Sequence, residues 1–518
     1  MNPKHIIIAP LAILLATGLY ACGGGNSEPQ DELSAVKNIL VIYAENRSFD
    51  NLYGNFPGAN GLHNVTASSA QQLDRDGTVL PVLPPIWGGL TGKGVTPAIT
   101  EAMTARLANG PFAINDPAGF DLSLSVMTRD LNHRFYENQM QIHGGKNDMF
   151  AAWGDSGAFV MGRYTTDAET LPLYKIAQEF TLADNFFMSA FGGSFLNHQW
   201  LACACTPTYP LANDSPAAGL ISAVEPDGVT LKLARFSPAS ALDGPPKFAN
   251  SGNLTPDFFA VNTMQPPYQP SFNPPPAGGD PRLSDPANPT TLPPQTQTHI
   301  GDLLNDANVT WAWYGGAWGD ALGNRTKINS VTIVPNFQMH HQPFNYFADL
   351  APGTANRALH LLDGGLGGSE FIKAIDAGSL PQVSFYKPQG NLNEHAGYTD
   401  IASGEAHIAD VIQHLQRSPQ WDGMVVVVTY DENGGTWDHV APPKGDRWGP
   451  GSRIPALIIS PYAKKGYVDH TQYDTTSILR LITKRYSLPQ LEGLVSRDAA
   501  LTANGGQPMG DLTNALEF

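Results

Sequence analysis

Short apolar runs alternate with longer amphipathic stretches along the chain. Residues 39–43 and 424–429 are almost wholly apolar, and residues 452–463 contain a third apolar run. Uninterrupted runs of this length are typical of strands that are buried on both faces of a parallel sheet. We therefore predict that these three segments are strands of one sheet.

Helical patterns lie between the first two of these runs. Residues 370–376 form one such stretch and residues 404–419 form another. In the second, the spacing puts four apolar side chains on one helix face, namely Ile408, Val411, Ile412 and Leu415. Strands that alternate with helices predict an α/β fold with a mainly parallel central sheet covered by helices on both faces.

Polar side chains follow two of the predicted strands directly. Glu45 and Asn46 come after the first strand, and Asp431 and Glu432 come after the second. In a parallel α/β sheet the ligand crevice lies beyond the carboxyl ends of the strands. Three carboxylates and an amide oxygen in one crevice favour a divalent cation. Each pair alone has a second explanation, because acidic residues after a strand also cap helices.

A glycine pair precedes a candidate nucleophile. Gly192 and Gly193 allow the backbone to approach a ligand closely, and Ser194 follows them at the predicted start of a helix that includes Asn197 and His198. A serine in this position can act as a nucleophile when a bound metal ion stabilises its alkoxide. Gly-Gly-Ser is also an ordinary loop sequence, so this motif alone leaves both interpretations open.

Composition and charge narrow the class of protein. The chain has 518 residues, of which 42% are hydrophobic, so it can bury a large core. Its 47 acidic and 30 basic residues give a formal net charge of -17. This charge argues against a nucleic-acid-binding protein. An anionic substrate would need local cations to hold it.

The N-terminus has the pattern of a bacterial lipoprotein signal. Lys4 and His5 precede an apolar stretch over residues 6–19, which is short for a membrane span. The stretch ends at Leu-Tyr-Ala-Cys, where Cys22 would be lipidated. We predict a signal peptide over residues 1–21, a flexible tether over 22–37 and anchoring of the protein in the bacterial cell envelope, facing the periplasm or the outside. An ordinary cleaved signal peptide is the alternative.

The rest of the chain is predicted to be one catalytic domain over residues 38–518. Its segment 251–294 is too rich in proline and glycine for regular structure, so we expect a long surface excursion there. Cys203 and Cys205 are either a disulfide in an oxidising compartment or two small buried side chains. They do not form a zinc site by themselves, since no second ligand pair stands nearby in the pattern.

Seven motifs in a fixed order carry a family resemblance. Between about residues 38 and 491 the chain resembles the bacterial phosphoesterase family of secreted phospholipases C and acid phosphatases, and most of all its respiratory-burst-inhibiting acid phosphatase branch. The resemblance implies an alkaline-phosphatase-like fold. The motifs are AENRSFDNLYG, LNHRFYENQMQIHGGKNDMF, FGGSFLNHQW, FQMHHQPFNYF, NEHAGYTD, YDENGGTWDHVAPP and GSRIPALIISPYA.

The resemblance also implies roles for individual residues. The implied ligands of one divalent metal ion, which the sequence does not identify among Ca, Mg, Mn and Zn, are Glu45, Asn46, Ser194, Asp431 and Glu432. Ser194 matches the nucleophile of the acid phosphatase branch. The residues implied to line the phosphate pocket are His133, His395, Asn46 and one of His340 and His341. Asp438 and His439 belong to a family motif but could lie either among the metal ligands or behind them.

The expected activity is that of a metal-dependent acid phosphatase. It would hydrolyse phosphomonoesters through a phosphoserine at Ser194, with His133 or His395 as proton donor. If the pocket histidines must be charged, activity requires a pH below about 6.5 unless neighbouring carboxylates raise their pKa. A phospholipase C that cleaves lipid phosphodiesters is the first alternative, and a binding module without activity is the second.

Overall fold

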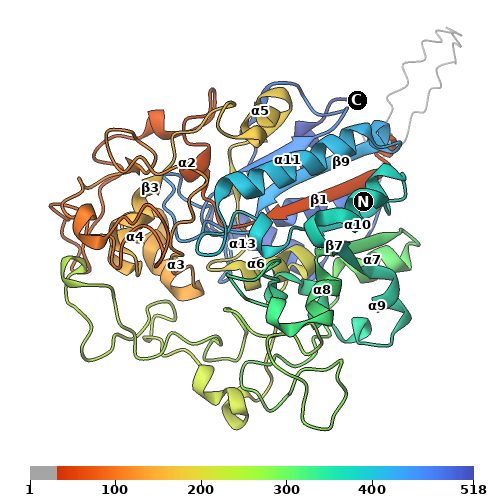
Figure 1. The fold of residues 1–518 in the computed structure, drawn as a ribbon, viewed down its shortest axis with the longest axis horizontal. Helices are drawn as coiled ribbons and strands as arrows, with labels where there is room; N and C mark the ends of the chain where they lie inside the picture. Colours follow the sequence, from red (N-terminus) through yellow and green to blue (C-terminus); the bar gives the residue numbers. More distant parts are fainter. Residues whose placement is uncertain (1–31) are drawn as a thin grey trace, which may run out of the picture.

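One eight-stranded sheet forms the centre of the molecule in the computed structural model, which describes residues 32–518 (Figure 1). Neighbouring strands are parallel except β10, which runs antiparallel to both of its neighbours. The predicted α/β fold with a mainly parallel sheet is therefore confirmed. In spatial order the strands are β11 (Tyr467–Asp469), β4 (Thr181–Ala183), β10 (Ala456–Ile459), β9 (Met424–Tyr430), β1 (Asn38–Ala44), β8 (Val383–Lys387), β6 (Trp311–Gly316) and β7 (Leu361–Gly365).

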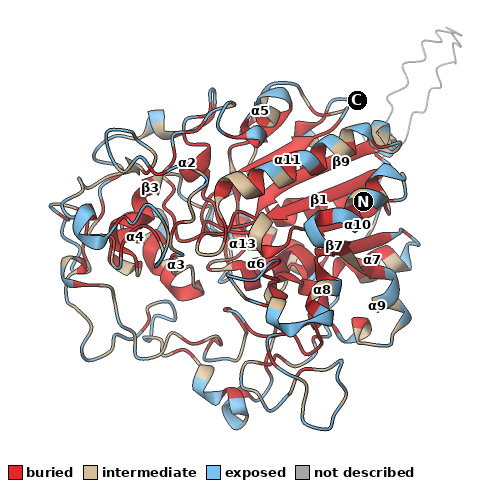
Figure 2. Cartoon of the chain, in the orientation of Figure 1, coloured by how far each residue is buried: buried red, intermediate tan, exposed pale blue. Residues whose placement is uncertain are grey.

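All three predicted strands are present. β1 and β9 lie side by side in the middle of the sheet, and every residue of both is buried, as their unbroken apolar runs require (Figure 2). The third predicted strand is β10. Two short pairs lie outside the main sheet, β12 (Tyr473–Asp474) with β5 (Phe186–Phe187) and β2 (Phe112–Ala113) with β3 (Gly162–Arg163).

Helices cover both faces of the sheet. Ile42 of β1 is in register with Tyr386 of β8, whose hydroxyl lies 2.7 Å from Nε2 of His407 in helix α11 (Ile401–Arg417). The next residue, Tyr43, points to the opposite face, where its ring lies 4.8 Å from that of His198 on α6. The helices are α2 (Phe49–Leu52), α3 (Phe135–Ile142), α4 (Phe150–Trp153), α5 (Pro172–Glu179), α6 (Ser194–Cys203), α7 (Ile300–Asp306), α8 (Trp318–Gly323), α9 (Ala355–His360), α10 (Ser369–Asp376), α11 (Ile401–Arg417), α12 (Thr476–Arg485) and α13 (Glu492–Ala503).

Both predicted helical stretches are helices. They correspond to α10 and α11, which lie in front of the sheet in Figure 1. The four apolar residues predicted to share a face of α11 are all buried, while the opposite side of that helix is exposed (Figure 2). Amphipathic spacing thus identified the face of α11 that packs on the sheet.

The proline- and glycine-rich segment 251–294 contains neither a helix nor a strand of the sheets described above. It is not purely a surface feature, because Leu254, Val261 and Met264 are fully buried. Cys203 and Cys205 form a disulfide at the end of α6, which settles the choice that the sequence left open.

The predicted signal peptide, Cys22 and residues 22–31 of the predicted tether lie outside the described residues. The remainder of that tether is packed rather than free, because the apolar side chains of Leu33 and Val36 are buried against the core. Within residues 32–518, the helices are all too short or too polar to cross a membrane.

Candidate active site

Two adjacent strand ends bring the predicted carboxylates together. Ala44, the last residue of β1, is in register with Tyr430, the last residue of β9, so the residues that follow them lie side by side. The backbone N–H of Asn46 donates to Oδ1 of Asp431 at 3.1 Å. Asn46 has φ +62°, a left-handed conformation that asparagine tolerates better than most residues. This turn directs its side chain into the crevice.

The Asn46 amide lies at the centre of the carboxylates. One of its two terminal atoms lies 2.8 Å from Oε2 of Glu45, 3.1 Å from Oδ1 of Asp431 and 2.8 Å from Oε1 of Glu432. The other lies 2.8 Å from Nε2 of His395. With nitrogen toward the carboxylates, the two amide hydrogens are shared among the three carboxylate oxygens. With oxygen toward them, four oxygens converge, which is the donor set of a hard divalent cation.

The electrostatics of this cluster also suit a cation. Burial raises the pKa of Glu45 and of Glu432 well above the ordinary range, and the neighbouring Asp431 carboxyl raises both further. All three carboxylates are fully buried. A cation between them would offset the cost of keeping three ionised groups away from water. The residues predicted as metal ligands therefore fit a divalent ion.

Ser194 lies next to the Glu45 carboxylate and the Asn46 amide. Its hydroxyl donates to Oε2 of Glu45 at 3.0 Å and lies 3.4 Å from Oδ1 of Asn46. It is the first residue of α6, where the unpaired backbone N–H groups favour negative charge. A side chain at Gly193 would lie 2.7 Å from the carbonyl oxygen of His133, so glycine is needed for this close approach.

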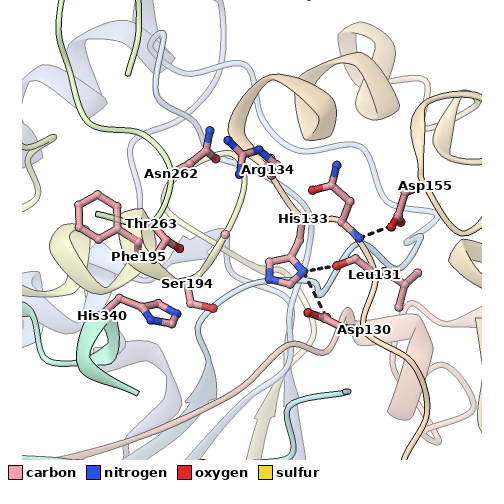
Figure 3. A pocket seen from close by; sticks show the side chains of 12 residues that line it. Asp130, Leu131, His133, Arg134, Asp155, Ser194, Phe195, Asn262, Thr263 and His340 are labelled. Atoms are coloured by element: carbon pink, nitrogen blue, oxygen red, sulfur yellow. Dashed lines mark hydrogen bonds and ion pairs between the residues drawn. The ribbon is translucent and has the colours of Figure 1, made fainter. Parts of the chain in front are cut away.

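The predicted pocket histidines occupy different positions. His133 and His340 line a cavity beside Ser194 (Figure 3). Nδ1 of His133 lies 2.6 Å from the carbonyl oxygen of Leu131, and its Nε2 lies 3.6 Å from Oε1 of Glu432. His395 is buried behind Asn46. His341 lies deeper, with Nδ1 3.2 Å from Oε1 of Glu45, so it contacts a predicted metal ligand rather than the cavity.

Burial changes the expected charge of three of these histidines. It lowers the pKa of His340 to about 3, and it lowers the pKa of His341 and of His395 well below the ordinary imidazole value. Nearby Lys387, His340 and His133 act in the same direction. The condition that the pocket histidines carry positive charge only below about pH 6.5 is therefore stricter for these three rings, because desolvation disfavours their charged form. They can serve as neutral hydrogen-bonding groups.

The cavity itself has a volume of about 400 Å³ and opens above Ser194. Figure 3 shows the Ser194 hydroxyl pointing into the space between His133 and His340. Most of the residues that line the cavity have polar side chains. The lining residues are Asp130, Leu131, Asn132, His133, Arg134, Asp155, Gly193, Ser194, Phe195, Asn262, Thr263 and His340.

A family model described as the phosphoesterase family matches residues 36–489. The chain belongs to the phosphoesterase family. This phosphoesterase is similar to phospholipase C A and phospholipase C B of Mycobacterium tuberculosis, each 24% identical and each match covering 94% of this chain and 78% of the relative. A non-hemolytic phospholipase C of Burkholderia pseudomallei is 27% identical over 42% of this chain and 35% of its own. These matches support a hydrolase of phosphoric esters.

Among solved structures, the phosphoesterase is similar to a protein in the alkaline phosphatase superfamily from Vibrio parahaemolyticus. The two share 11% identity and a TM-score of 0.31, over 64% of this chain and 63% of that one.

Asp438 and His439 of the phosphoesterase lie behind the metal-ligand loops. Asp438 accepts from Nε of the buried Arg453 at 3.0 Å, and Nδ1 of His439 lies 2.7 Å from Oδ2 of Asp50. Asp50 belongs to α2, which follows Asn46 closely in the chain. The two residues therefore tie the loops of the site together rather than joining the four converging oxygens.

Two residues of the site were missed as candidates. Lys387 ends β8 next to β1, and its Nζ contacts Oε1 of Glu45. His198 lies one helical turn after Ser194 on α6, with Nε2 3.8 Å from the same oxygen. Lys387 could have been found by applying the strand-end argument to residues 383–387, and His198 by its spacing from Ser194.

Proposed function

We propose that this phosphoesterase is a metal-dependent phosphatase that hydrolyses phosphomonoesters through a phosphoserine at Ser194. The observation that carries the proposal is the position of the Ser194 hydroxyl. This hydroxyl donates a hydrogen bond to Glu45, lies at the N-terminus of α6 and faces a polar cavity. A nucleophile, a site for a cation and space for a phosphate thus meet at one point.

The divalent ion would be held by Glu45, Asn46, Asp431 and Glu432, with Ser194 within reach. When bound, such an ion polarises a phosphoryl oxygen and favours the alkoxide form of a hydroxyl. The oxygen-rich donor set suits Ca, Mg or Mn and also accommodates Zn. We propose one such ion per chain.

The chain's own groups then account for the protons. As Oγ of Ser194 bonds to phosphorus, its hydroxyl proton passes to Oε2 of Glu45, and the bond from phosphorus to the ester oxygen breaks. His133 protonates the departing alkoxide. In the second step water attacks phosphorus and gives a proton to His133, while Oγ leaves and regains its proton from Glu45. Alcohol and phosphate are released.

His133 is the better proton donor of the two candidates. Its ring lines the cavity, whereas His395 is buried, with Nδ1 close to the carbonyl oxygen of Ala396 and Nε2 against the Asn46 amide. Burial lowers the pKa of His340, His341 and His395, which makes these rings poorer proton donors. His340 and Asn46 are placed to bind phosphoryl oxygens.

A phospholipase C remains the second candidate, because the relatives named above are phospholipases C. The cavity favours the phosphatase. Only Leu131, Gly193 and Phe195 among its lining residues lack a polar side chain, and a small polar cavity suits a water-soluble ester better than a lipid.

Turnover of a chromogenic phosphomonoester beside phosphatidylcholine separates the two functions. We expect a higher kcat/KM for the monoester, and a preference of more than tenfold for the lipid would establish the phospholipase instead. Ser194→Ala should lower kcat by about 10³-fold or more, since the nucleophile is lost. Ser379→Ala, at an exposed position shortly after the end of α10, is the matched control. A folded Ser194→Ala protein with normal turnover would exclude the phosphoserine.

We also propose that Cys22 is lipidated and anchors the enzyme in the bacterial cell envelope. The support is the sequence Leu-Tyr-Ala-Cys after the apolar stretch. Cys22→Ser should move the protein from the membrane fraction to the soluble fraction of fractionated cells. An unchanged distribution would contradict the anchor.

A further inference from the structure

Glu45 uses its two carboxylate oxygens for different contacts. Oε2 faces Ser194 and Asn46, as described above. Oε1 points the other way, into a fully buried group formed by Lys387, His198 and His341. This second group has no place in the proposed proton transfers, and it lies too deep to touch a substrate in the cavity.

The two histidines of this group have the arrangement of metal ligands. Nδ1 of His198 lies 2.7 Å from the carbonyl oxygen of Ser194, which fixes the hydrogen on Nδ1 and leaves a lone pair on Nε2, which lies 3.8 Å from Oε1 of Glu45. His341 stacks on His198, with ring centroids 4.9 Å apart. Within residues 32–518, Nε2 of each ring has no hydrogen-bond partner.

Together these groups form a potential second cation site. One ligand atom from each of Glu45, His198 and His341 can be chosen such that all three lie within 4.8 Å of one another. Two imidazole nitrogens and one carboxylate oxygen are a donor set that binds zinc with a further position open. By donor chemistry alone, this part of the protein should therefore take up a transition-metal ion.

Lys387 lies in the same place. Its Nζ contacts Oε1 of Glu45 and donates to the carbonyl oxygen of Tyr43 at 2.8 Å, and the side chain is fully buried. The ammonium is thus bonded to the same oxygen that a metal ion would need. An ammonium and a divalent ion that shared this one oxygen would also lie close together and repel each other with little screening in a dry interior.

We propose that Lys387 is a built-in cation that takes the place of a second metal ion, so that the enzyme holds a single divalent ion on the Ser194 side of Glu45. Lys387 is in this sense a positioning residue. It binds Oε1 and leaves Oε2 for the nucleophile and the one ion. This inference depends on the proposed function in one respect: it assumes that the single divalent ion is bound by Glu45, Asn46, Asp431 and Glu432.

Metal stoichiometry tests this role directly. The full-length metal-free protein is titrated with Co²⁺, and bound metal is measured by elemental analysis and by the absorption spectrum of the ion. Wild type should saturate at about one equivalent, and Lys387→Met at about two, with a new spectral component from nitrogen ligands. Lys387→Met combined with His341→Ala should return to about one. Lys373→Met, at an exposed lysine of α10, should match wild type.

The outcomes separate this inference from the proposed function. A folded Lys387→Met protein that still binds one equivalent would overturn the role of Lys387 and leave the phosphatase intact. If Lys387→Met does not fold, the Co²⁺ stoichiometry of wild type still tests the role of Lys387. If wild type binds a second equivalent of Co²⁺ and His341→Ala does not, the role of Lys387 is overturned. If wild type and His341→Ala both saturate at one equivalent, the role is supported. Wild type that binds no ion would overturn metal dependence itself.

Discussion

Arg453 joins the two loops that carry the predicted metal ligands. Its side chain is fully buried, with Nε donating to Asp438 at 3.0 Å and Nη2 donating to Asp50 at 3.1 Å. Nη1 donates to the carbonyl oxygens of Asn60 and Asp184 at 2.7 and 2.8 Å. Asp50 follows the loop of Glu45, and Asp438 follows the loop of Glu432. Replacing Arg453 should therefore disturb stability and metal binding together.

The expected cost of Arg453→Met follows from burial. Methionine fills much of the space but removes the guanidinium charge between two buried carboxylates, Asp438 and Asp50, and this costs about 3–5 kcal/mol although Asp50 keeps a second partner in His439. At about 2.1 cal/mol/K per residue, a chain of this length has an unfolding entropy of roughly 1 kcal/mol/K, so the melting temperature should fall by about 3–5 °C. The apparent affinity for the divalent ion should fall as well.

Differential scanning calorimetry with and without the metal measures both effects. Arg447→Met is the matched control, since Arg447 pairs with Asp257 in an ion pair whose side chains are 52% and 51% exposed. Loss of such a surface pair costs about 1 kcal/mol or less, which is about 1 °C here. If Arg453→Met melts within about 1 °C of the Arg447 variant, the buried arginine does not hold the loops together and the reasoning fails.

Two further predictions concern pH. Because burial and Asp431 raise the pKa of Glu45 and Glu432, their ionisation in the metal-free protein opposes folding increasingly as the pH rises above about 4.3. Chelation should therefore lower the melting temperature more at about pH 8 than at about pH 5, and equal shifts would contradict this. For His439, burial lowers the pKa, but its contact with Asp50 and the charge of nearby Asp438 outweigh burial and raise it. The stabilisation that protonated His439 gives to the folded protein is complete below about pH 6.5. It is lost as the pH rises through the raised pKa of His439. His439→Gln should destabilise the protein more at about pH 5.5 than at about pH 9, and calorimetry showing the reverse order would refute it.

The sequence predicted the oxygen cluster because one simple rule governs it. Side chains that follow parallel neighbouring strands meet at one sheet edge, and the register of Ala44 with Tyr430 realises this for Glu45 and Asp431. The direction of β10 could not be predicted, since a strand buried on both faces has the same apolar pattern whichever way it runs.

The charge states of the histidines could not be predicted from the sequence, for a different reason. Burial of His341 and His395 depends on segments distant in the chain that enclose them, and no local pattern reports this. Lys387 was missed because it ends a short strand, β8, and a charged residue at the end of a short strand resembles an ordinary surface residue in the sequence. His198 lies on α6, which is buried all round and so lacks an amphipathic pattern.

The central position of β1 has a consequence for how the enzyme is made. β1 is synthesised near the start of the chain, yet both strands that pair with it, β8 and β9, begin only at Val383 and Met424. Asn46 and Asp431 are 385 positions apart. During translation the first strand must therefore wait, without sheet partners, until most of the polypeptide has left the ribosome, and such non-local pairing is slow. A product truncated before residue 431 lacks the proposed metal ligands Asp431 and Glu432, so we expect it to be inactive.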